Sequence, residues 1–147
     1  MLDWGAIVDI ATRNPDVPEL KLQRESFKKG VMRTVKRGEG MAFQIIAAIK
    51  KGGSYKVLRV NVKENEAYVI IRFILPGGSG LNYHQFFISR TAAGRVVASD
   101  LYVFLIAERI SDTVARHWRR LAAEELKSVA ARAIAPPTHF MPMRRES

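Results

Sequence analysis

The sequence predicts an α+β fold in which N-terminal helices pack on a curved four-stranded antiparallel sheet and a long C-terminal helix follows. Apolar residues recur at helical spacing through residues 1–50, alternate with polar residues through residues 54–106, and return to helical spacing through residues 107–134. Helical spacing places apolar side chains on one side of a helix, and alternation places them on one face of a strand. A run of helices followed by a run of strands is typical of α+β domains.

Three helices are expected before the sheet, over residues 2–12, 18–36 and 41–50. Pro15 and Pro18 interrupt the first helical pattern, because proline lacks the backbone N–H that a helix interior needs. Proline is tolerated in a first helical turn, so the second helix can begin near Pro18. Gly52 and Gly53 follow the third pattern, as is usual where a helix ends.

Four strands are expected, over residues 55–62, 67–75, 81–90 and 95–106. In the first, Leu58, Val60 and Val62 alternate with polar side chains, which indicates a strand with one buried face. If Val62 pairs with Ala67, the apolar side chains of the first two strands lie on a single face, and this agreement favours that register. Segments 76–80 and 91–94 contain the glycines of the next two turns.

The register of the last two hairpins decides which polar side chains meet. We expect Leu75 to pair with Leu81, and Arg90 with Arg95. This register would place four polar side chains on the core-facing side of the sheet, namely Tyr83, Gln85, Asp100 and Tyr102. His84 would lie on the opposite face. A slip of one residue would exchange the two faces and bring His84 next to Asp100, and loop length alone leaves both registers open.

A long helix is expected over residues 107–134, because Ile110, Val114 and Trp118 recur at helical spacing after the last strand. Ser111-Asp112 could instead cap a helix that starts there. The Pro136-Pro137 pair would stop this helix. Residues 136–147 show no periodicity, and we expect them to form a loose tail. The 147 residues are 48% hydrophobic, which is enough for one domain with its own core, and we place this domain at residues 1–135.

The order of the elements and the last two strands resemble the nuclear transport factor 2-like group of cystatin-like α+β domains. The resemblance covers residues 19–107 and rests on the segments GLNYHQFFISR and GRVVASDLYVF, where a Gly-Arg-Val entry leads to a polar residue within an apolar strand. It implies a curved sheet that wraps around a helix and leaves a cone-shaped cavity. Domains of this group include small isomerases and dehydratases, ligand-binding modules and non-catalytic assembly modules, so the fold alone does not choose a function.

Two interpretations of the polar residues in this cavity follow. In the first, the chain is a small cofactor-independent isomerase or lyase in which Asp100 is the general base and Tyr83, Tyr102 or His84 is a hydrogen-bond donor. In the second, Asp100 and Gln85 hydrogen-bond each other and the tyrosines belong to the core. The second is the commoner arrangement, so we expect a non-catalytic module that binds a small apolar ligand or a protein.

The net charge of +10 favours an anionic partner. Basic side chains gather in two helical segments, which contain Lys28, Lys29 and Arg33 and, further along the chain, Arg116, Arg119 and Arg120. Neither segment interleaves these residues with the exposed aromatic side chains on which nucleic-acid bases stack. Nucleic-acid binding through these helices is therefore a third hypothesis that charge alone supports, and its affinity would fall steeply with salt.

The expected register also leaves an apolar outer face on the sheet, carrying Tyr68, Ile70, Ile74, Phe86 and Ile88. Such a face is too apolar to remain in water. Either the C-terminal helix or a partner must cover it, so we expect a homodimer through the sheet face or the C-terminal helix.

Several chemistries are not expected. The sequence has no cysteine, which excludes disulfides and cysteine nucleophiles. His84, His117 and His139 lack metal-binding spacing, and the glycine segments lack a phosphate-binding pattern, so we expect no metal and no cofactor. No apolar run approaches the roughly 20 residues of a membrane span. The first residues lack the basic start of a signal peptide, so we expect a cytoplasmic protein.

Overall fold

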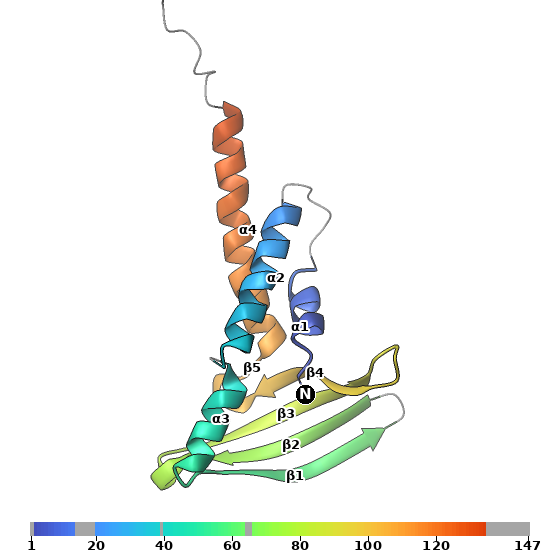
Figure 1. Cartoon of the computed structure of the whole chain (residues 1–147), viewed down its shortest axis with the longest axis vertical. Helices are drawn as coiled ribbons and strands as arrows, with labels where there is room; N and C mark the ends of the chain where they lie inside the picture. Colours follow the sequence, from blue (N-terminus) through green and yellow to red (C-terminus); the bar gives the residue numbers. More distant parts are fainter. Residues whose placement is uncertain (1, 14–19, 39, 64–65, 135–147) are drawn as a thin grey trace, which may run out of the picture.

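The computed structural model describes residues 2–13, 20–38, 40–63 and 66–134, and it confirms the α+β class. This part of the chain forms helices on a five-stranded antiparallel sheet (Figure 1). The helices are α1 (Trp4–Ala11), α2 (Lys21–Lys36), α3 (Met41–Lys50) and α4 (Ile110–Ile134). The predicted tail at 136–147, the loop at 14–18 and the middle of the turn at 63–66 lie outside the described residues.

The strands are neighbours in the sheet in the order of the chain: β1 (Ser54–Lys63), β2 (Glu66–Ile74), β3 (Leu81–Arg90), β4 (Val96–Val103) and β5 (Glu108–Arg109). The described sheet thus has one strand more than the four that we predicted. β4 ends earlier than expected, because a short 3-10 helix (Phe104–Ile106) and Ala107, with a left-handed φ of 51°, turn the chain back. The returning β5 pairs with the end of β4, which delays the start of α4 to Ile110.

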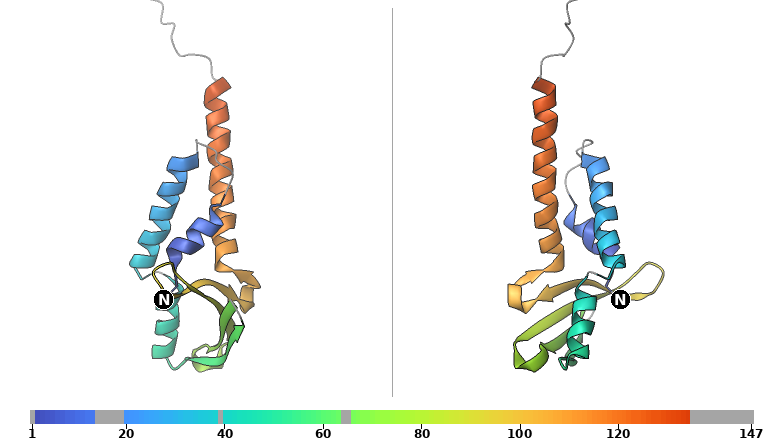
Figure 2. Two further views of the ribbon diagram at one scale, coloured as in Figure 1. Left: turned by 90° about the vertical axis from the view of Figure 1, so that its right-hand side faces the viewer. Right: turned by 60° about the vertical axis from the view of Figure 1, so that its left-hand side comes forward.

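The sheet is curved, and α3 lies across its concave side (Figure 2). The other three described helices stand beyond the β4 edge, where α2 and α4 run side by side in opposite directions (Figure 1). The C-terminal half of α4 extends away from the sheet, so α4 leaves most of the outer, convex face open. The sheet therefore presents two different faces, one partly roofed by α3 and one without a helical layer in the described part of the chain.

Two buried apolar clusters fix the helices. The first lies between α1, β4 and α4 and consists of Ile7, Leu101, Val103 and Ile110. The second lies between α2 and α4 and consists of Leu20, Trp118 and Ala122, with Phe27 packed against them. Burial of Trp118, which its place on the apolar stripe predicts, is confirmed, since only 1% of the residue is exposed. In contrast, α3 buries no residue fully.

Val62 lies opposite Ala67, as predicted, but a bulge at Leu58 shifts the rest of this register, so that Val57 rather than Leu58 lies opposite Ile71. The predicted burial of Leu58, Val60 and Val62 is wrong, since each is more than half exposed. The second hairpin differs from the prediction by one residue: Leu81 pairs with Ile74, because the backbone N–H of Leu75 donates to the carbonyl of Gly80 at 2.9 Å and closes the turn. Since a one-residue shift exchanges the faces of a strand, every β3 side chain lies on the face opposite to the one expected.

The registers of the second and third hairpins require three corrections. His84 lies on the concave side, with Phe86 and Ile88, which we had placed on the outer face. Tyr83, Gln85 and Tyr102 lie on the outer face instead. Arg90 pairs with Val96 rather than Arg95, and a bulge at Ser99 places Asp100 opposite Phe87. Asp100 therefore meets neither Gln85 nor His84 across the strands.

Candidate functional site

A cavity of 360 Å³ lies between α3 and the concave face of the sheet. Its walls are mostly apolar and include Met41, Ile45, Phe73, Leu81, Val103 and Leu105. Asn82 and His84 of β3 bring polar atoms to this apolar lining, and both are buried. They share the concave face because side chains two residues apart on a strand point the same way. A mostly apolar cavity with a few convergent polar groups has the general character of a ligand site.

The polar groups form a hydrogen-bonded chain. The Oδ1 atom of Asn82 accepts the backbone N–H groups of Tyr83, at 2.8 Å, and Leu105, at 2.9 Å. The Nδ2 atom of Asn82 lies 3.2 Å from Nε2 of His84. The other ring nitrogen, Nδ1, lies 2.8 Å from the hydroxyl of Tyr55 on β1. Tyr55 and His84 also make edge-on ring contacts with each other and tilted or edge-on contacts with Phe73.

The two backbone donors fix the direction of this chain. Because Oδ1 of Asn82 accepts two N–H groups, the amide nitrogen must face His84 and donate to its Nε2 atom. The ring proton of neutral His84 is then on Nδ1, which donates to the Tyr55 oxygen. The hydroxyl hydrogen of Tyr55 is left to donate elsewhere, and it has no acceptor among the described residues. The chain therefore ends in an unused hydrogen-bond donor.

Burial keeps this chain uncharged. Removal from water lowers the pKa of His84, which favours the neutral imidazole at neutral pH. Protonation would also place an N–H of His84 against the N–H of Asn82. Burial raises the pKa of Tyr55, so its hydroxyl keeps the proton that it can donate. The cavity thus offers hydrogen-bonding groups without a charged partner for an ion.

An apolar trough continues along the same face. It has a volume of 290 Å³ and is lined by Leu2, Val69, Ile71, Phe86, Ile88 and Ala98, among others. On β1, the concave-face residues Val57, Val60 and Val62 remain 59%, 62% and 72% exposed. Helix α3 also carries an exposed stripe of Phe43, Ile46 and Ile49. Uncovered apolar surface of this extent is a common mark of a binding surface.

Asp100, the candidate general base, is buried at the junction of β4 and α4. Its Oδ2 atom accepts the hydroxyl of Ser111 at 2.6 Å, and its Oδ1 atom accepts the backbone N–H groups of Ser111, at 3.2 Å, and Leu101, at 2.8 Å. Both oxygen atoms thus hold the first turn of α4. A carboxylate in this position satisfies N–H groups that the helix itself cannot.

The predicted pocket residues divide between the two faces. Gln85 and Asp100 line one outer-face groove of 590 Å³, although no hydrogen bond joins them. Tyr83 and Tyr102 flank Phe104, with ring centres 6.2 and 5.0 Å from it. His84 lies on the other side of the sheet. The sequence therefore identified His84 but not its partners Tyr55 and Asn82, and the alternation of Asn82 with His84 was the available signal.

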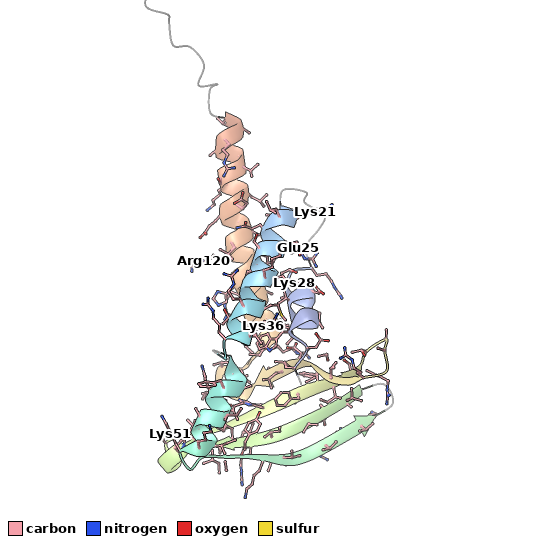
Figure 3. The ribbon with its side chains drawn as sticks, viewed as in Figure 1. Lys21, Glu25, Lys28, Lys36, Lys51 and Arg120 are labelled. Carbon is pink, nitrogen blue, oxygen red and sulfur yellow. The ribbon has the colours of Figure 1, made fainter. Side chains whose placement is uncertain are left out.

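The two predicted basic clusters lie on neighbouring helices. Figure 3 shows Lys28 on α2 near Glu25, with Lys21 and Lys36 toward the two ends of the helix, and Arg120 on the adjacent α4. Three of the six predicted cations have carboxylate partners: Lys28 contacts Asp9 at 2.9 Å, Arg116 contacts Glu108, and Arg120 contacts Glu124 at 3.7 Å. Lys29, Arg33 and Arg119 have no such partner among the described residues. The helical surface is thus basic but partly neutralised.

Within residues 2–13, 20–38, 40–63 and 66–134, no three histidine, aspartate or glutamate side chains come together as a metal site would require. None of the described helices has the length and apolar character needed to cross a membrane. Comparisons with protein-family models, curated proteins and solved structures gave no match.

Proposed function

We propose that the chain is a non-catalytic binding module whose concave sheet face takes an elongated, mostly apolar ligand with a neutral hydrogen-bond acceptor at one end. The hydrogen-bonded chain from Asn82 through His84 to Tyr55 is the observation that carries this proposal. It places uncharged donors beside an apolar cavity of 360 Å³, a size within the usual range of small-molecule sites. The nuclear transport factor 2-like resemblance is consistent with such a cavity and remains part of the proposal.

The chemistry of the lining supports a neutral acceptor over a carboxylate. The cavity-lining residues include no Lys or Arg, and burial favours the neutral form of His84. A buried carboxylate without a cationic partner would lose its hydration without compensation. A ketone, ester or amide oxygen would accept the second amide hydrogen of Asn82, which lines the cavity, or the hydroxyl of Tyr55, which lies against the lining residues Phe73 and His84, at much lower cost. The trough along β2 and β3 would hold the remaining apolar part of the ligand.

Assembly with a second copy is the alternative that the exposed apolar surface favours. Phe43 and Ile46 of α3 and Val60 and Val62 of β1 are all more than half exposed. β1 is also an edge strand, with backbone groups free to pair with another chain. Light scattering over a range of protein concentrations tests this alternative, because a homodimer built on these residues would dissociate in a Phe43→Ser variant.

A ligand-dependent thermal-shift assay tests the main proposal. Long-chain methyl ketones or esters should raise the melting temperature more than the matching fatty acids, since a ligand stabilises the state that it binds. The Tyr55→Phe variant should weaken binding of the neutral ligand by about fivefold, the value of one ordinary hydrogen bond. Tyr68→Phe is the matched control, because its hydroxyl lies on the outer face and accepts from Asn61 at 2.7 Å.

Two results would count against the ligand proposal. If neither ligand class raises the melting temperature, the concave face has no such ligand. If Tyr55→Phe and Tyr68→Phe weaken binding equally, the polar chain does not contact the ligand. Preference for the fatty acid would reject the neutral acceptor and point to a cation outside the cavity.

A further inference from the structure

The outer face of the sheet combines cationic and aromatic side chains. Cross-strand pairing places Lys56, Arg72 and Tyr83 in one row across β1, β2 and β3. A second row, two residues along the strands, includes Arg59, Tyr102 and Arg109. Neighbouring strands lie about 4.8 Å apart, so side chains within a row are close enough to contact one ligand together. This face is distinct from the concave site and from the basic helices.

The cations of this face are not neutralised by the described part of the protein. Lys56, Arg59, Arg72 and Arg109 form no ion pair with any described carboxylate. Two acidic residues line the adjoining groove: Asp100 is buried and bonded to Ser111, and Asp112 is exposed but forms no ion pair with these cations. The helical cations differ, because several of them already have carboxylate partners. This face therefore combines unpaired cations with aromatic side chains, and unpaired cations also lie on the helices, at Lys29, Arg33 and Arg119 among others.

The aromatic side chains of this face remain partly accessible. Tyr68, Tyr83 and Tyr102 are neither buried nor fully exposed. Arg109 already stacks on an aromatic ring of this face, with its guanidinium carbon 4.2 Å from the centre of Phe87. Aromatic rings on an open antiparallel sheet, beside cations, can stack unpaired bases while the cations contact phosphates.

We infer that this outer face binds single-stranded nucleic acid. The charge decides between this partner and a second copy of the chain, because a symmetric dimer through the same face would bring its unpaired cations against one another. The aromatic rings decide between a nucleic acid and a simple anion, since an anion would need only the cations. The inference does not depend on the ligand proposed for the concave face, because alternate side chains form the two surfaces.

Fluorescence anisotropy with labelled oligouridine and oligothymidine of about 12 nucleotides, within the usual site size, tests the inference. Tyr83→Leu should weaken binding about tenfold by removing one stacking platform. The Lys56→Gln, Arg59→Gln double variant should lower the slope of log affinity against log salt by about 1.4, the value for two phosphate contacts on a single strand. The matched control is the Lys29→Gln, Arg33→Gln double variant, which removes the same charge from α2 and should leave both quantities near those of the wild type.

Each outcome is decisive. Binding that weakens in the sheet variants but not in the α2 control supports the inference. The oligonucleotide that binds more tightly then shows whether the face prefers RNA or DNA. Equal losses in both double variants would overturn it in favour of diffuse attraction to a basic protein. Absence of binding to either oligonucleotide at low salt would overturn it as well. A dimer that the sheet variants dissociate would assign the face to a second copy instead.

Discussion

The carboxylate of Asp100 should stabilise the protein by fastening the first turn of α4 to β4. Replacing Asp100 by Ala removes the acceptors of three hydrogen bonds, two from backbone N–H groups and one from the Ser111 hydroxyl. Hydrogen bonds to charged groups contribute about 1.5 kcal/mol each at the low end of their range, so the three sum to about 4.5 kcal/mol before water replaces any of them. Water can reach the junction through the adjoining groove and replace part of this loss, so we expect the free energy of unfolding to fall by about 3 kcal/mol.

Urea unfolding followed by circular dichroism measures this effect. Ser111→Ala should cost about 1–2 kcal/mol, because it leaves Oδ2 of Asp100 without its hydroxyl donor. The double variant should cost less than the sum of the single variants, with a coupling energy of about 1–2 kcal/mol. Asp112→Ala is the control: this exposed carboxylate lies in the same helical turn, and its loss should cost only about 0.3–1 kcal/mol through the helix dipole.

The same measurement separates the capping role from the general-base hypothesis. The Asp100→Asn side chain keeps an oxygen that can accept from one N–H group but loses the charge. This substitution should therefore lower the free energy of unfolding by about 1–2 kcal/mol. A carboxylate held ready for proton transfer often strains the fold, and its replacement then leaves stability unchanged or raised. An Asp100→Asn protein as stable as the wild type, with no coupling between Asp100 and Ser111, would refute the capping argument.

Three further predictions concern His84, Trp118 and Glu108. Burial lowers the pKa of His84 in the folded state, so below about pH 6.5 the unfolded state binds a proton that the folded state does not. Acidification through this range should therefore lower the unfolding free energy of the wild type relative to that of His84→Phe, by at most about 1.4 kcal/mol per pH unit. Urea titrations at several pH values check this, and parallel curves for the two proteins would contradict it. Trp118→Ala should lower the free energy of unfolding, measured with urea, by about 3–5 kcal/mol, because it leaves a cavity beside Phe27 between α2 and α4. A loss below about 1 kcal/mol would show that α2 and α4 pack differently. The hydrogen bonds from Arg116, and secondly from Thr113, lower the pKa of Glu108, so NMR titration of Arg116→Gln should show that pKa rising, and an unchanged value would exclude this ion pair in solution.

The sequence predicted the bounds of the helices and strands better than the register in which the strands pair. The bounds of α3 and β3 agree with the predicted residues 41–50 and 81–90, because strong patterns there end at glycine-containing turns. The second hairpin was wrong by one residue, since the five-residue segment 76–80 can close on either Gly80 or Leu81. Only the contact between Leu75 and Gly80 decides between them. Pattern and loop length carry no information on such a contact.

The polar chain depends on this alignment, which explains why two of its three residues were missed. Tyr55 comes from β1 and His84 from β3, so their contact requires two successive registers to be right. Asn82 was visible as the alternate neighbour of His84, but its second role, accepting the N–H of Leu105, depends on the turn after β4. The bulge at Ser99 likewise directs Asp100 toward α4, and no local sequence signal marks it.

Alternation along one strand makes the two proposed surfaces separable by experiment. His84 faces the cavity and the adjacent Tyr83 faces the outer groove, although their backbones are joined. A substitution at Tyr83 can therefore change nucleic-acid binding and leave the concave ligand site in place, whereas Tyr55→Phe should do the reverse. If each variant impaired both activities, the cause would be a general loss of the sheet, and the assignment of one function to each face would fail.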